Sequence, residues 1–229
     1  MNDTHLVLDD SAVVWSVPRE ELSERLVDAP LVIVMHGRGS HENDLAQLLP
    51  MLPADAVYAF LRAPISGAPW GLGGWSWFPL DAPGGVTSSA ASAAADAVLG
   101  WLDRVEAEYG APRAIAAMGF SQGGMMSIQL LGMRVHRFAA AVNLSGASAP
   151  GVLPTDEELA AVQPPLFWGR DVADPVIAAD AIARTAEFVP GRFRVVERVY
   201  PGIAHSISRE EMDDVSAFLR VTLGLEGMA

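Results

Sequence analysis

The stretch MGFSQGGMMS, residues 118–127, places Ser121 between two glycines, after an apolar run and before a segment with helical spacing. The pattern G-x-S-x-G fixes only three positions, so it is weak evidence in a chain that contains 21 glycines. The elements around it must therefore decide whether Ser121 is a nucleophile or an ordinary hydroxyl in a glycine-rich turn.

Strands and helices are predicted to alternate on both sides of this stretch. The short apolar runs typical of buried strands are 30–37, 56–64, 113–120, 138–146, 165–169 and 192–202. The segments with helical spacing are 87–109, 122–134, 176–188 and 209–223. Such alternation predicts an α/β fold with a mostly parallel sheet that helices cover on both faces.

Two further segments do not fit the alternation. Residues 6–17, LVLDDSAVVWSV, are interpreted as an antiparallel hairpin at one edge of the sheet. Residues 66–85 form a long irregular insertion, and loops of that length are more often functional than idle. We find no internal repeat and no linker, so the 229 residues, 51% of them hydrophobic, are expected to form a single domain, 1–229.

The charge of the chain limits its partners. A formal net charge of −13 without any basic stripe argues against nucleic acid and anionic membrane surfaces, since both are bound by clustered Lys and Arg. The first residues are acidic where a signal peptide is basic, and no apolar run approaches the roughly 18 residues that span a bilayer. We expect a cytoplasmic protein without stable membrane insertion.

Two residue types are missing from the sequence. Without cysteine there is no disulfide, no thiolate metal site and no cysteine nucleophile. All 15 basic residues are arginine, and without lysine there is no Schiff base, no Ser-Lys dyad and no P-loop lysine. These absences exclude several enzyme classes before any motif is weighed. We expect no cofactor and no metal ion.

Ser121 lies at a predicted strand-to-helix junction. This is the context of a nucleophile elbow, a sharp turn that lifts a serine above the sheet. This context explains why positions 119 and 123 are glycine, because a β-carbon at either position would clash in the crowded turn. The helix that begins near Gln122 also directs free N–H groups toward any anion formed there.

A serine nucleophile needs a base, and in this topology the base follows the serine and the acid along the chain. Only His136 and His205 follow Ser121. His136 lies in the basic segment RVHRF at the end of the post-serine helix, where it complements the helix dipole. His205 lies in the loop after the strand 192–202, so we predict that His205 is the base.

The carboxylate that orients the base is harder to choose. Asp156 is interpreted as a first-turn acid of a helix, and Asp180 lies inside another helix. The loop after the strand 165–169 offers Asp171 and Asp174. We favour Asp174 because Pro175 fixes an extended approach and starts the next helix, but Asp171 remains open, since spacing does not separate neighbours in one loop.

Two main-chain N–H groups are expected to form the oxyanion hole. The loop MHGRGS, residues 35–40, follows an early strand and contains glycines that let the backbone bend inward. The predicted donors are the N–H groups of Arg38 and Gln122. His36 is interpreted as structural, packing or hydrogen-bonding to shape this loop.

Aromatic residues and methionines offer a wall for an apolar acyl pocket. The candidates are Trp70, Trp75, Trp77, Phe78, Met118, Met125 and Met126. The alternatives are that the methionines are ordinary core and that the aromatics only anchor the long loop to the sheet. As substrate-binding residues we select Trp75, Trp77, Phe78 and Met125.

Five sequence blocks occur in an order that matches a known family. They are VMHGRGS (34–40), GGWSWF (73–78), MGFSQGG (118–124), WGRDVADPVI (168–177) and GIAHSI (202–207). With these blocks the chain resembles the bacterial serine esterases of the phospholipase/carboxylesterase family of α/β-hydrolases, which are similar to acyl-protein thioesterases and lysophospholipases. The resemblance implies the α/β-hydrolase fold and covers nearly the whole chain.

Carried over residue by residue, the resemblance implies Ser121 as nucleophile, Asp174 as acid, His205 as base, and the amides of Arg38 and Gln122 as oxyanion donors. Ser40 and Ser206 depart from the family, since thioesterase relatives carry aspartate at the first position and many members carry glutamate at the second. These departures leave the triad intact but weigh against a thioesterase.

We therefore expect a cofactor-independent serine hydrolase that cleaves a small-molecule ester or thioester through an acyl-enzyme. The alternatives within enzymes are a lysophospholipase, an acyl thioesterase and, with added peroxide, a perhydrolase or haloperoxidase. From another class, the same fold can be a non-catalytic ligand-binding module. A homodimer stays open, because a single sequence does not show which apolar residues are exposed.

Overall fold

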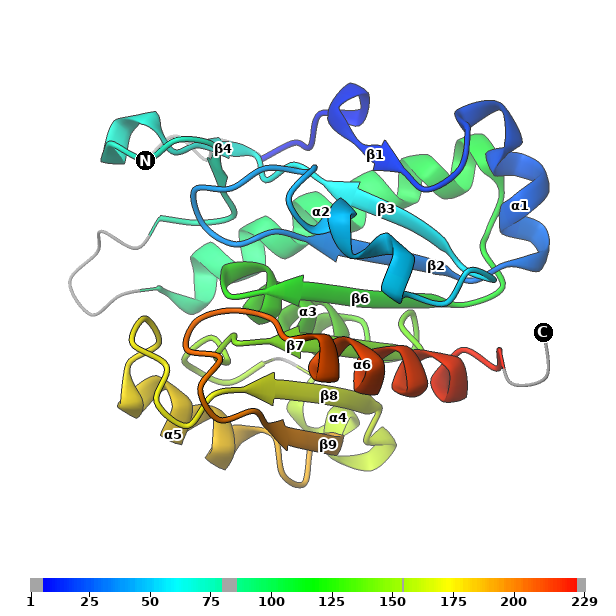
Figure 1. The fold of residues 1–229 in the computed structure, drawn as a ribbon. Coiled ribbons are helices and arrows are strands. Elements are labelled where there is room, and N and C mark those ends of the chain that lie inside the picture. Colours follow the sequence, from blue (N-terminus) through cyan, green and yellow to red (C-terminus); the bar gives the residue numbers. More distant parts are fainter. Residues whose placement is uncertain (1–5, 80–85, 154, 226–229) are drawn as a thin grey trace.

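The computed structural model describes residues 6–79, 86–153 and 155–225. Its main strands are β1 (Val14–Trp15), β2 (Leu31–Met35), β3 (Val57–Leu61), β6 (Ile115–Phe120), β7 (Ala140–Leu144), β8 (Pro165–Arg170) and β9 (Arg194–Val199). They form one sheet of seven strands in the order β1-β3-β2-β6-β7-β8-β9 (Figure 1). Within it, β1 pairs antiparallel with β3, and the remaining neighbours pair in parallel.

The helices connect these strands. They are α1 (Leu22–Asp28), α2 (Ser88–Tyr109), α3 (Gln122–Met133), α4 (Asp156–Val162), α5 (Ala179–Phe188) and α6 (Arg209–Thr222). The short 3-10 helices are η1 (Asp10–Ala12), η2 (Arg19–Glu21), η3 (Leu45–Met51) and η4 (Ala68–Trp70). Every run predicted as a buried strand contains a strand, and each of the segments with helical spacing contains a helix.

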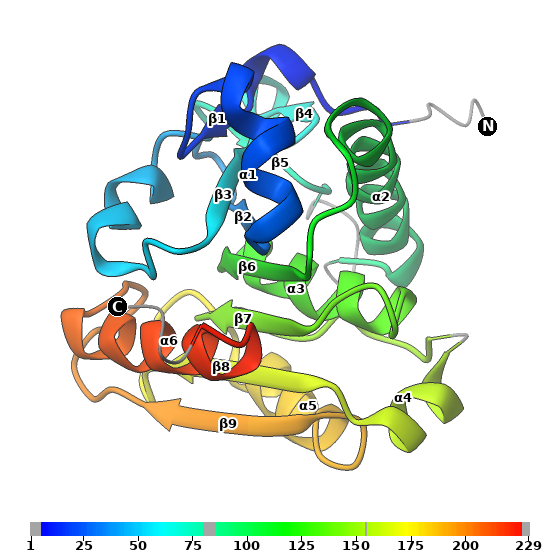
Figure 2. The same cartoon turned by 90° about the vertical axis from the view of Figure 1, so that its right-hand side faces the viewer.

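Helices cover both faces of the sheet. Along β2 the side chains alternate, so that Leu31, Ile33 and Met35 face one core while Val32 and Val34 face the other. The first core includes residues of α1, α2, α3 and α4, and the second includes residues of η3 and α6 (Figures 1 and 2). The predicted sheet, parallel apart from one edge and buried on both faces, is confirmed.

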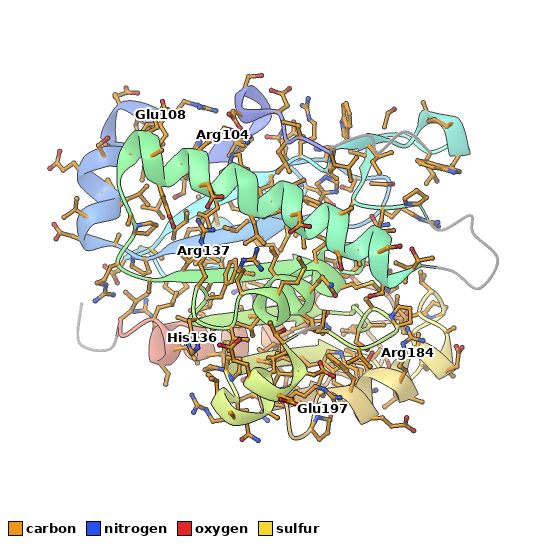
Figure 3. All side chains as sticks on the ribbon, turned by 180° about the vertical axis from the view of Figure 1, so that it is seen from behind. Arg104, Glu108, His136, Arg137, Arg184 and Glu197 are labelled. Atoms are coloured by element: carbon orange, nitrogen blue, oxygen red, sulfur yellow. The ribbon has the colours of Figure 1, made fainter. Side chains whose placement is uncertain are left out.

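The long helix α2 follows the predicted stripe. Its buried positions include Ala91, Ala94, Val98, Leu102 and Val105. The polar side of the helix meets Arg137, labelled in Figure 3, whose guanidinium lies 2.7 Å from Asp103 and 3.1 Å from Glu106. The helix ends at Gly110, which adopts a φ of +94°.

The predicted hairpin over residues 6–17 is wrong. Asp9 accepts a hydrogen bond from the Ser11 N–H at 2.9 Å and caps the short helix η1, so the chain turns locally instead of returning as a paired strand. Only β1 joins the sheet. The segment that follows carries no prediction from the sequence; in it Leu22 and Leu26 are four residues apart and both are buried in α1.

The insertion at 66–85 contains structure of its own. Strand β4 (Ile65–Ser66) pairs antiparallel with β5 (Trp75–Ser76), and η4 lies between them. Residues 80–85 lie outside the described residues. Within the described ranges, none of the helices is long and apolar enough to cross a membrane.

The topology gathers several loops at one edge. The carboxyl ends of parallel strands lie on the same side of a sheet, so the loops after β2, β6, β8 and β9 all emerge together. Those loops begin after Met35, Phe120, Arg170 and Val199. They carry the residues that the sequence singles out.

Candidate active site

The turn from β6 to α3 holds Ser121 in a strained conformation. Its φ is +54° and its ψ is −112°, values that non-glycine residues rarely adopt. The Ser121 N–H donates to the Leu144 carbonyl at 2.8 Å, which ties the turn to the neighbouring strand β7. Backbone strain of this kind clusters at functional sites.

The glycines on either side of Ser121 are required by space. A β-carbon added at Gly119 would lie 2.2 Å from the carbonyl of Gly123, and one added at Gly123 would lie 2.0 Å from the Met35 oxygen. Neither neighbour is the flexible end of a side chain, so neither can give way. The crowding predicted for the elbow turn (residues 119–123) is confirmed.

A chain of hydrogen bonds connects three side chains from separate loops. The Nε2 atom of His205 lies 2.9 Å from the Ser121 hydroxyl, and its Nδ1 atom lies 2.7 Å from Asp174 Oδ2. The Phe120 ring packs beside the imidazole at 4.8 Å between centroids. Chemically, such an imidazole can take the hydroxyl proton while the carboxylate stabilises the positive charge that results.

Asp174 is itself held in place. Its Oδ1 accepts hydrogen bonds from the N–H groups of Val176 at 2.8 Å and Ile177 at 3.0 Å, which leaves Oδ2 for His205. Only 2% of the Asp174 side chain is exposed, compared with 15% of the His205 side chain. The carboxylate is therefore buried and oriented, while the imidazole keeps a path to solvent.

Asp171, the alternative in the same loop, makes different contacts. Its Oδ1 accepts from the Ala173 N–H at 3.0 Å, and its Oδ2 accepts from the Ala204 N–H at 2.7 Å. These hydrogen bonds hold the pKa of Asp171 below its usual value. The structure thus brings Asp174, and not Asp171, onto the imidazole of His205.

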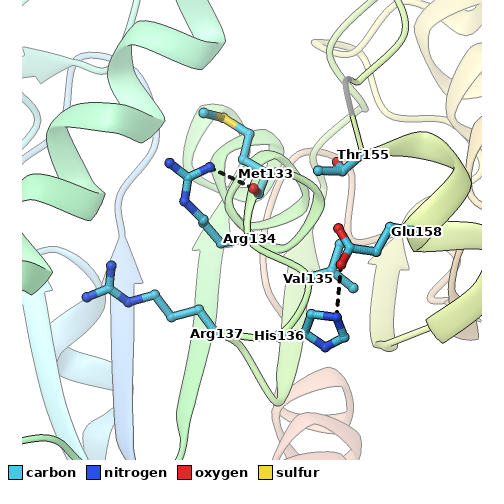
Figure 4. A pocket seen from close by; sticks show the side chains of 7 residues that line it. All are labelled: Met133, Arg134, Val135, His136, Arg137, Thr155 and Glu158. Carbon is cyan, nitrogen blue, oxygen red and sulfur yellow. Dashed lines mark hydrogen bonds and ion pairs between the residues drawn. The ribbon is translucent and has the colours of Figure 1, made fainter.

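The structure separates His136 from this group. His136 follows the carboxyl end of α3, whereas Ser121 precedes its amino end, and the 12 residues of α3 span about 18 Å. The His136 ring, 72% exposed, lies 2.9 Å from Glu158 in a surface pocket of about 600 Å³ (Figure 4). It contacts α4 and takes no part in the Ser121 cluster.

His36 has the shaping role expected of it. The Ala63 N–H donates to its Nε2 at 3.2 Å, so the ring proton is on Nδ1, which donates to the Gly37 carbonyl at 2.7 Å. Burial lowers the pKa of His36, which keeps the ring neutral. The ring therefore ties the oxyanion loop (residues 36–40) to the end of β3.

The expected oxyanion donors are unpaired. Neither the Arg38 N–H nor the Gln122 N–H donates to an acceptor within the described residues. The loop around Arg38 is supported from behind, since Gly39 donates to the Trp75 carbonyl at 2.8 Å and Trp75 donates to the Ser40 carbonyl at 2.8 Å. Unpaired N–H groups at the start of a helix are the usual donors to a developing oxyanion.

The side chain of Gln122 has a role that sequence reasoning missed. Its Oε1 accepts from the Trp77 N–H at 2.8 Å, and its Nε2 donates to the Phe78 carbonyl at 2.7 Å. The Trp77 indole N–H donates in turn to the His36 carbonyl at 2.9 Å. The Gln122 amide therefore fastens the 66–79 segment to the elbow, and nothing in the sequence pattern indicated that partner.

The candidate substrate-binding residues differ in accessibility. Trp77 is 0% exposed and Phe78 is 1% exposed, so their side chains have no surface that a ligand can contact. Met118 and Met126, both 0% exposed, belong to the core, as the alternative interpretation allowed. Trp75 is partly buried beneath the Arg62 guanidinium, 5.0 Å from its ring.

Glu42, Asp44 and Arg62, three polar residues near the oxyanion loop, also escaped sequence reasoning. Glu42, only 7% exposed, accepts from Arg62 Nε at 2.8 Å, and this pairing lowers the pKa of Glu42. Ser40 donates its hydroxyl to Asp44 at 2.6 Å. The contacts order the loop that carries Arg38. Within the described residues, no group of three His, Asp or Glu side chains could hold a metal ion.

The arrangement of sheet, helices and loops defines an α/β-hydrolase fold. A solved carboxylesterase of Bacillus cereus has the same fold, with a TM-score of 0.76 at 16% identity, over 92% of this chain and 93% of that one. The phospholipase/carboxylesterase family model matches residues 22–223, so the chain belongs to that family. The resemblance inferred from the five sequence blocks is confirmed.

Two curated relatives mark the range of the family. A probable carboxylesterase of Oryza sativa subsp. japonica is 26% identical over 226 residues, which is 89% of this chain and 85% of the relative. An acyl-protein thioesterase 1 of Debaryomyces hansenii is 35% identical over 104 residues, which is 44% of this chain and 45% of the relative. The second match thus spans less than half of the thioesterase. Members of the family are esterases and thioesterases.

Proposed function

We propose that this protein is a serine carboxylesterase that hydrolyses carboxylic esters with small to medium acyl chains through an acyl-enzyme on Ser121. The observation that carries the proposal is the continuous hydrogen-bond chain from Asp174 through His205 to Ser121, at a strained turn. A nucleophile within reach of a base, with the base oriented by a carboxylate, is the arrangement that activates a serine.

In the first half of the reaction Ser121 attacks the acyl carbon. His205 Nε2, 2.9 Å from the hydroxyl, takes the proton as the new C–O bond forms. The carbonyl electrons move to the oxygen, and the free N–H groups of Arg38 and Gln122 stabilise the charge. The carboxylate of Asp174 stabilises the imidazolium that forms.

The second half releases both products. The imidazolium of His205 gives its proton to the alkoxide oxygen as the C–O bond to the alcohol breaks, which leaves the acyl group on Ser121. Water then attacks the acyl carbon and gives a proton to His205, which passes it to the Ser121 oxygen as the acid departs. Every proton is returned, so no cofactor is consumed.

For the acyl pocket we propose Trp75 and Met125 as contact residues. Trp75 is partly buried, and Met125, 9% exposed, lies on the first turn of α3, four residues after Ser121. Trp77 and Phe78, fully buried, are proposed to support this wall from behind. The formal charge of −13 favours a neutral substrate over an acidic one.

A thioester is the second candidate substrate. It is favoured by the similarity to the acyl-protein thioesterases of Debaryomyces hansenii and Saccharomyces cerevisiae, and disfavoured by Ser40 in place of the aspartate of that branch. The same Ser121 chemistry cleaves either bond, because only the leaving group differs. A matched pair of substrates, an ester and a thioester with the same acyl chain, separates the two.

The test is hydrolysis of p-nitrophenyl esters from acetate to palmitate by purified protein, with Ser121→Ala as the blank. We expect turnover that requires Ser121 and is fastest for short to medium chains. A folded protein that hydrolyses none of the series and resists labelling by a fluorophosphonate would contradict the proposal and favour a ligand-binding module.

A further inference from the structure

The carboxylate of Asp171 connects two loops of the candidate site. One loop, residues 171–177, carries Asp174, and we call it the acid loop. The other, residues 200–207, carries His205, and we call it the histidine loop. Oδ1 of Asp171 accepts from Ala173 at 3.0 Å, inside the acid loop, and Oδ2 accepts from Ala204 at 2.7 Å, inside the histidine loop.

Ala204, the residue before His205, has an unfavourable backbone conformation. Its φ is +54°, in the left-handed region that side chains with a β-carbon rarely adopt. Ala204 is exposed and belongs to neither hydrophobic core, so core packing does not hold it there. Within the described residues, the acceptor for the Ala204 N–H is Asp171 Oδ2. The strained conformation is therefore held by that hydrogen bond.

The conformation of Ala204 sets the position of the imidazole. His205 must place Nε2 within 2.9 Å of Ser121 and Nδ1 within 2.7 Å of Asp174 at the same time. A change in the dihedral angles of the preceding residue swings the ring, and misplacement of about 1 Å can cost on the order of 10²-fold in rate. The distance from the His205 imidazole to Ser121 therefore depends on Asp171, a residue that acts through Ala204.

An ionised carboxylate suits this role. Asp171 is only 2% exposed, and two main-chain N–H groups donate to its separate oxygens. An amide of the same shape offers a single acceptor oxygen, so its NH₂ group would face one of the two N–H donors. Asparagine therefore keeps the volume but breaks one of the two connections.

We propose that Asp171 is a positioning residue, whose carboxylate joins the acid loop to the histidine loop and holds Ala204 in the conformation that aims His205 at Ser121. This inference rests on the proposed function for its kinetic consequence. The part that concerns structure, the position of the His205 ring, can be tested whether or not the protein turns over a substrate.

The experiment compares Asp171→Asn with the double variant Asp171→Asn, Ala204→Gly. Glycine adopts a positive φ without strain, so it restores the conformation without the carboxylate. We expect Asp171→Asn to lower kcat on p-nitrophenyl butyrate by about 10- to 100-fold with KM within about twofold of wild type. The added Ala204→Gly should recover at least about fivefold of that loss, because glycine adopts the positive φ of this position without strain and Ala204 lies outside both hydrophobic cores.

Two control variants separate positioning from stability. Asp156→Asn removes a carboxylate that accepts from Leu153 at 3.3 Å and pairs with Arg192 at 3.0 Å, away from the site. It should lower Tm and leave kcat unchanged. Gln163 has a φ of +48° at the end of α4, so Gln163→Gly relieves similar strain and should not rescue Asp171→Asn.

A readout that does not need turnover is the downfield proton NMR signal of the hydrogen bond between His205 Nδ1 and Asp174. The signal should weaken in Asp171→Asn, return in the double variant and persist in Asp156→Asn. If the wild type shows no turnover that requires Ser121, the proposed function fails while this signal still decides the positioning role. If Asp171→Asn does not fold, Ala204→Val tests the same link, since a β-branched residue opposes a positive φ.

Wild-type kcat in folded Asp171→Asn, with an unchanged His205 signal, would overturn the inference. So would a loss of kcat that Gln163→Gly relieves as well as Ala204→Gly does. For Ala204→Val the expected result is a lower kcat and a weaker signal, and full activity with an unchanged signal would also overturn it.

Discussion

The elbow turn and the pair of loops that carry Asp174 and His205 are built by different forces. The elbow is fixed by backbone contact: β-carbons at Gly119 or Gly123 would lie 2.2 and 2.0 Å from main-chain neighbours, far inside van der Waals contact. The two loops are fixed by the carboxylates of Asp171 and Asp174, whose oxygens accept hydrogen bonds from main-chain N–H groups. Steric constraints leave a mark in the sequence as glycine, whereas a polar connection between distant loops leaves none.

The largest effect is expected when the elbow turn loses Ser121, the proposed nucleophile. Ser121→Ala should lower kcat by on the order of 10⁶-fold, because no other group supplies the attacking oxygen. The hydroxyl's hydrogen bond is to His205, so the fold should be intact by circular dichroism. Steady-state hydrolysis of a p-nitrophenyl ester measures the loss. Residual activity above about one hundredth of wild type would show that Ser121 is not the nucleophile.

The acid loop offers the next largest effect. Asp174→Asn should lower kcat by about 10⁴-fold, because the amide no longer stabilises the imidazolium and favours the wrong tautomer of His205. Asp180→Asn, inside α5, is the matched control and should keep wild-type kcat. An active Asp174 variant beside an inactive Asp171→Asn variant would reverse the assignment of the acid.

The steric constraint on the elbow backbone can be tested through stability, without replacing Ser121, Asp174 or His205. Gly123→Ala should lower the free energy of unfolding by about 3 kcal/mol or more, since its β-carbon would meet the Met35 oxygen at 2.0 Å. Gly100→Ala, in the middle of α2 with open space around it, should instead stabilise by about 0.5–1 kcal/mol. Urea unfolding compares the two, and a similar result for both would contradict the steric account.

A buried carboxyl on α6, that of Glu211, should make the free energy of unfolding depend on pH. Glu211 is 0% exposed, neither oxygen has a hydrogen-bond partner within the described residues, and burial raises its pKa to about 7. The unfolded chain loses this proton near pH 4.5, while the folded chain keeps it up to about pH 7. Folding is therefore favoured most below pH 4.5, and the advantage is lost as the pH rises to 7.

Glu211→Gln removes that dependence because glutamine does not titrate. Relative to wild type, the variant should gain up to about 3 kcal/mol in the free energy of unfolding between pH 4.5 and pH 8. Urea unfolding across this range measures it, with Glu210→Gln, exposed on the same turn, as control. Parallel stability curves for wild type and Glu211→Gln would show that the carboxyl is not protonated when folded.

The smallest effect is expected at Arg38, which contributes its main chain. Arg38→Ala keeps the N–H group and should change kcat by less than about tenfold. A loss as large as that of Ser121→Ala in a folded variant would overturn the main-chain assignment. Gln122→Ala is the informative comparison, because its side chain connects the elbow to Trp77 and Phe78 and should cost more than Arg38→Ala.

Much of the fold could be predicted because its signals are local. The apolar runs at 30–37 and 113–120 mark strands that are buried on both faces, and the stripe on α2 has helical spacing. The hairpin at 6–17 was predicted wrongly, since alternating apolar residues do not reveal that Asp9 caps a turn. Strand patterns are read from side-chain polarity, and a side-chain hydrogen bond to the backbone can override them.

The candidate site divides in the same way. Chain order and loop position selected His205 over His136, and the structure places His205, and not His136, within hydrogen-bond distance of Ser121. Glycine spacing located the crowded turn around Ser121. The inward packing of Trp77 and Phe78 could not be predicted, because the aromatic content of a loop does not tell which side of it faces the core. The tie from Asp171 to Ala204 joins residues 33 positions apart and is visible only in the folded chain.

Covalent labelling tests the central claim, the nucleophilic role of Ser121, most directly. The folded protein is incubated with a fluorophosphonate, digested and mapped by mass spectrometry while residual hydrolysis is followed in parallel. The account predicts one adduct, on the peptide that contains Ser121, and a loss of activity in proportion to labelling. An adduct on another residue, or hydrolysis that persists after Ser121 is fully labelled, would contradict it.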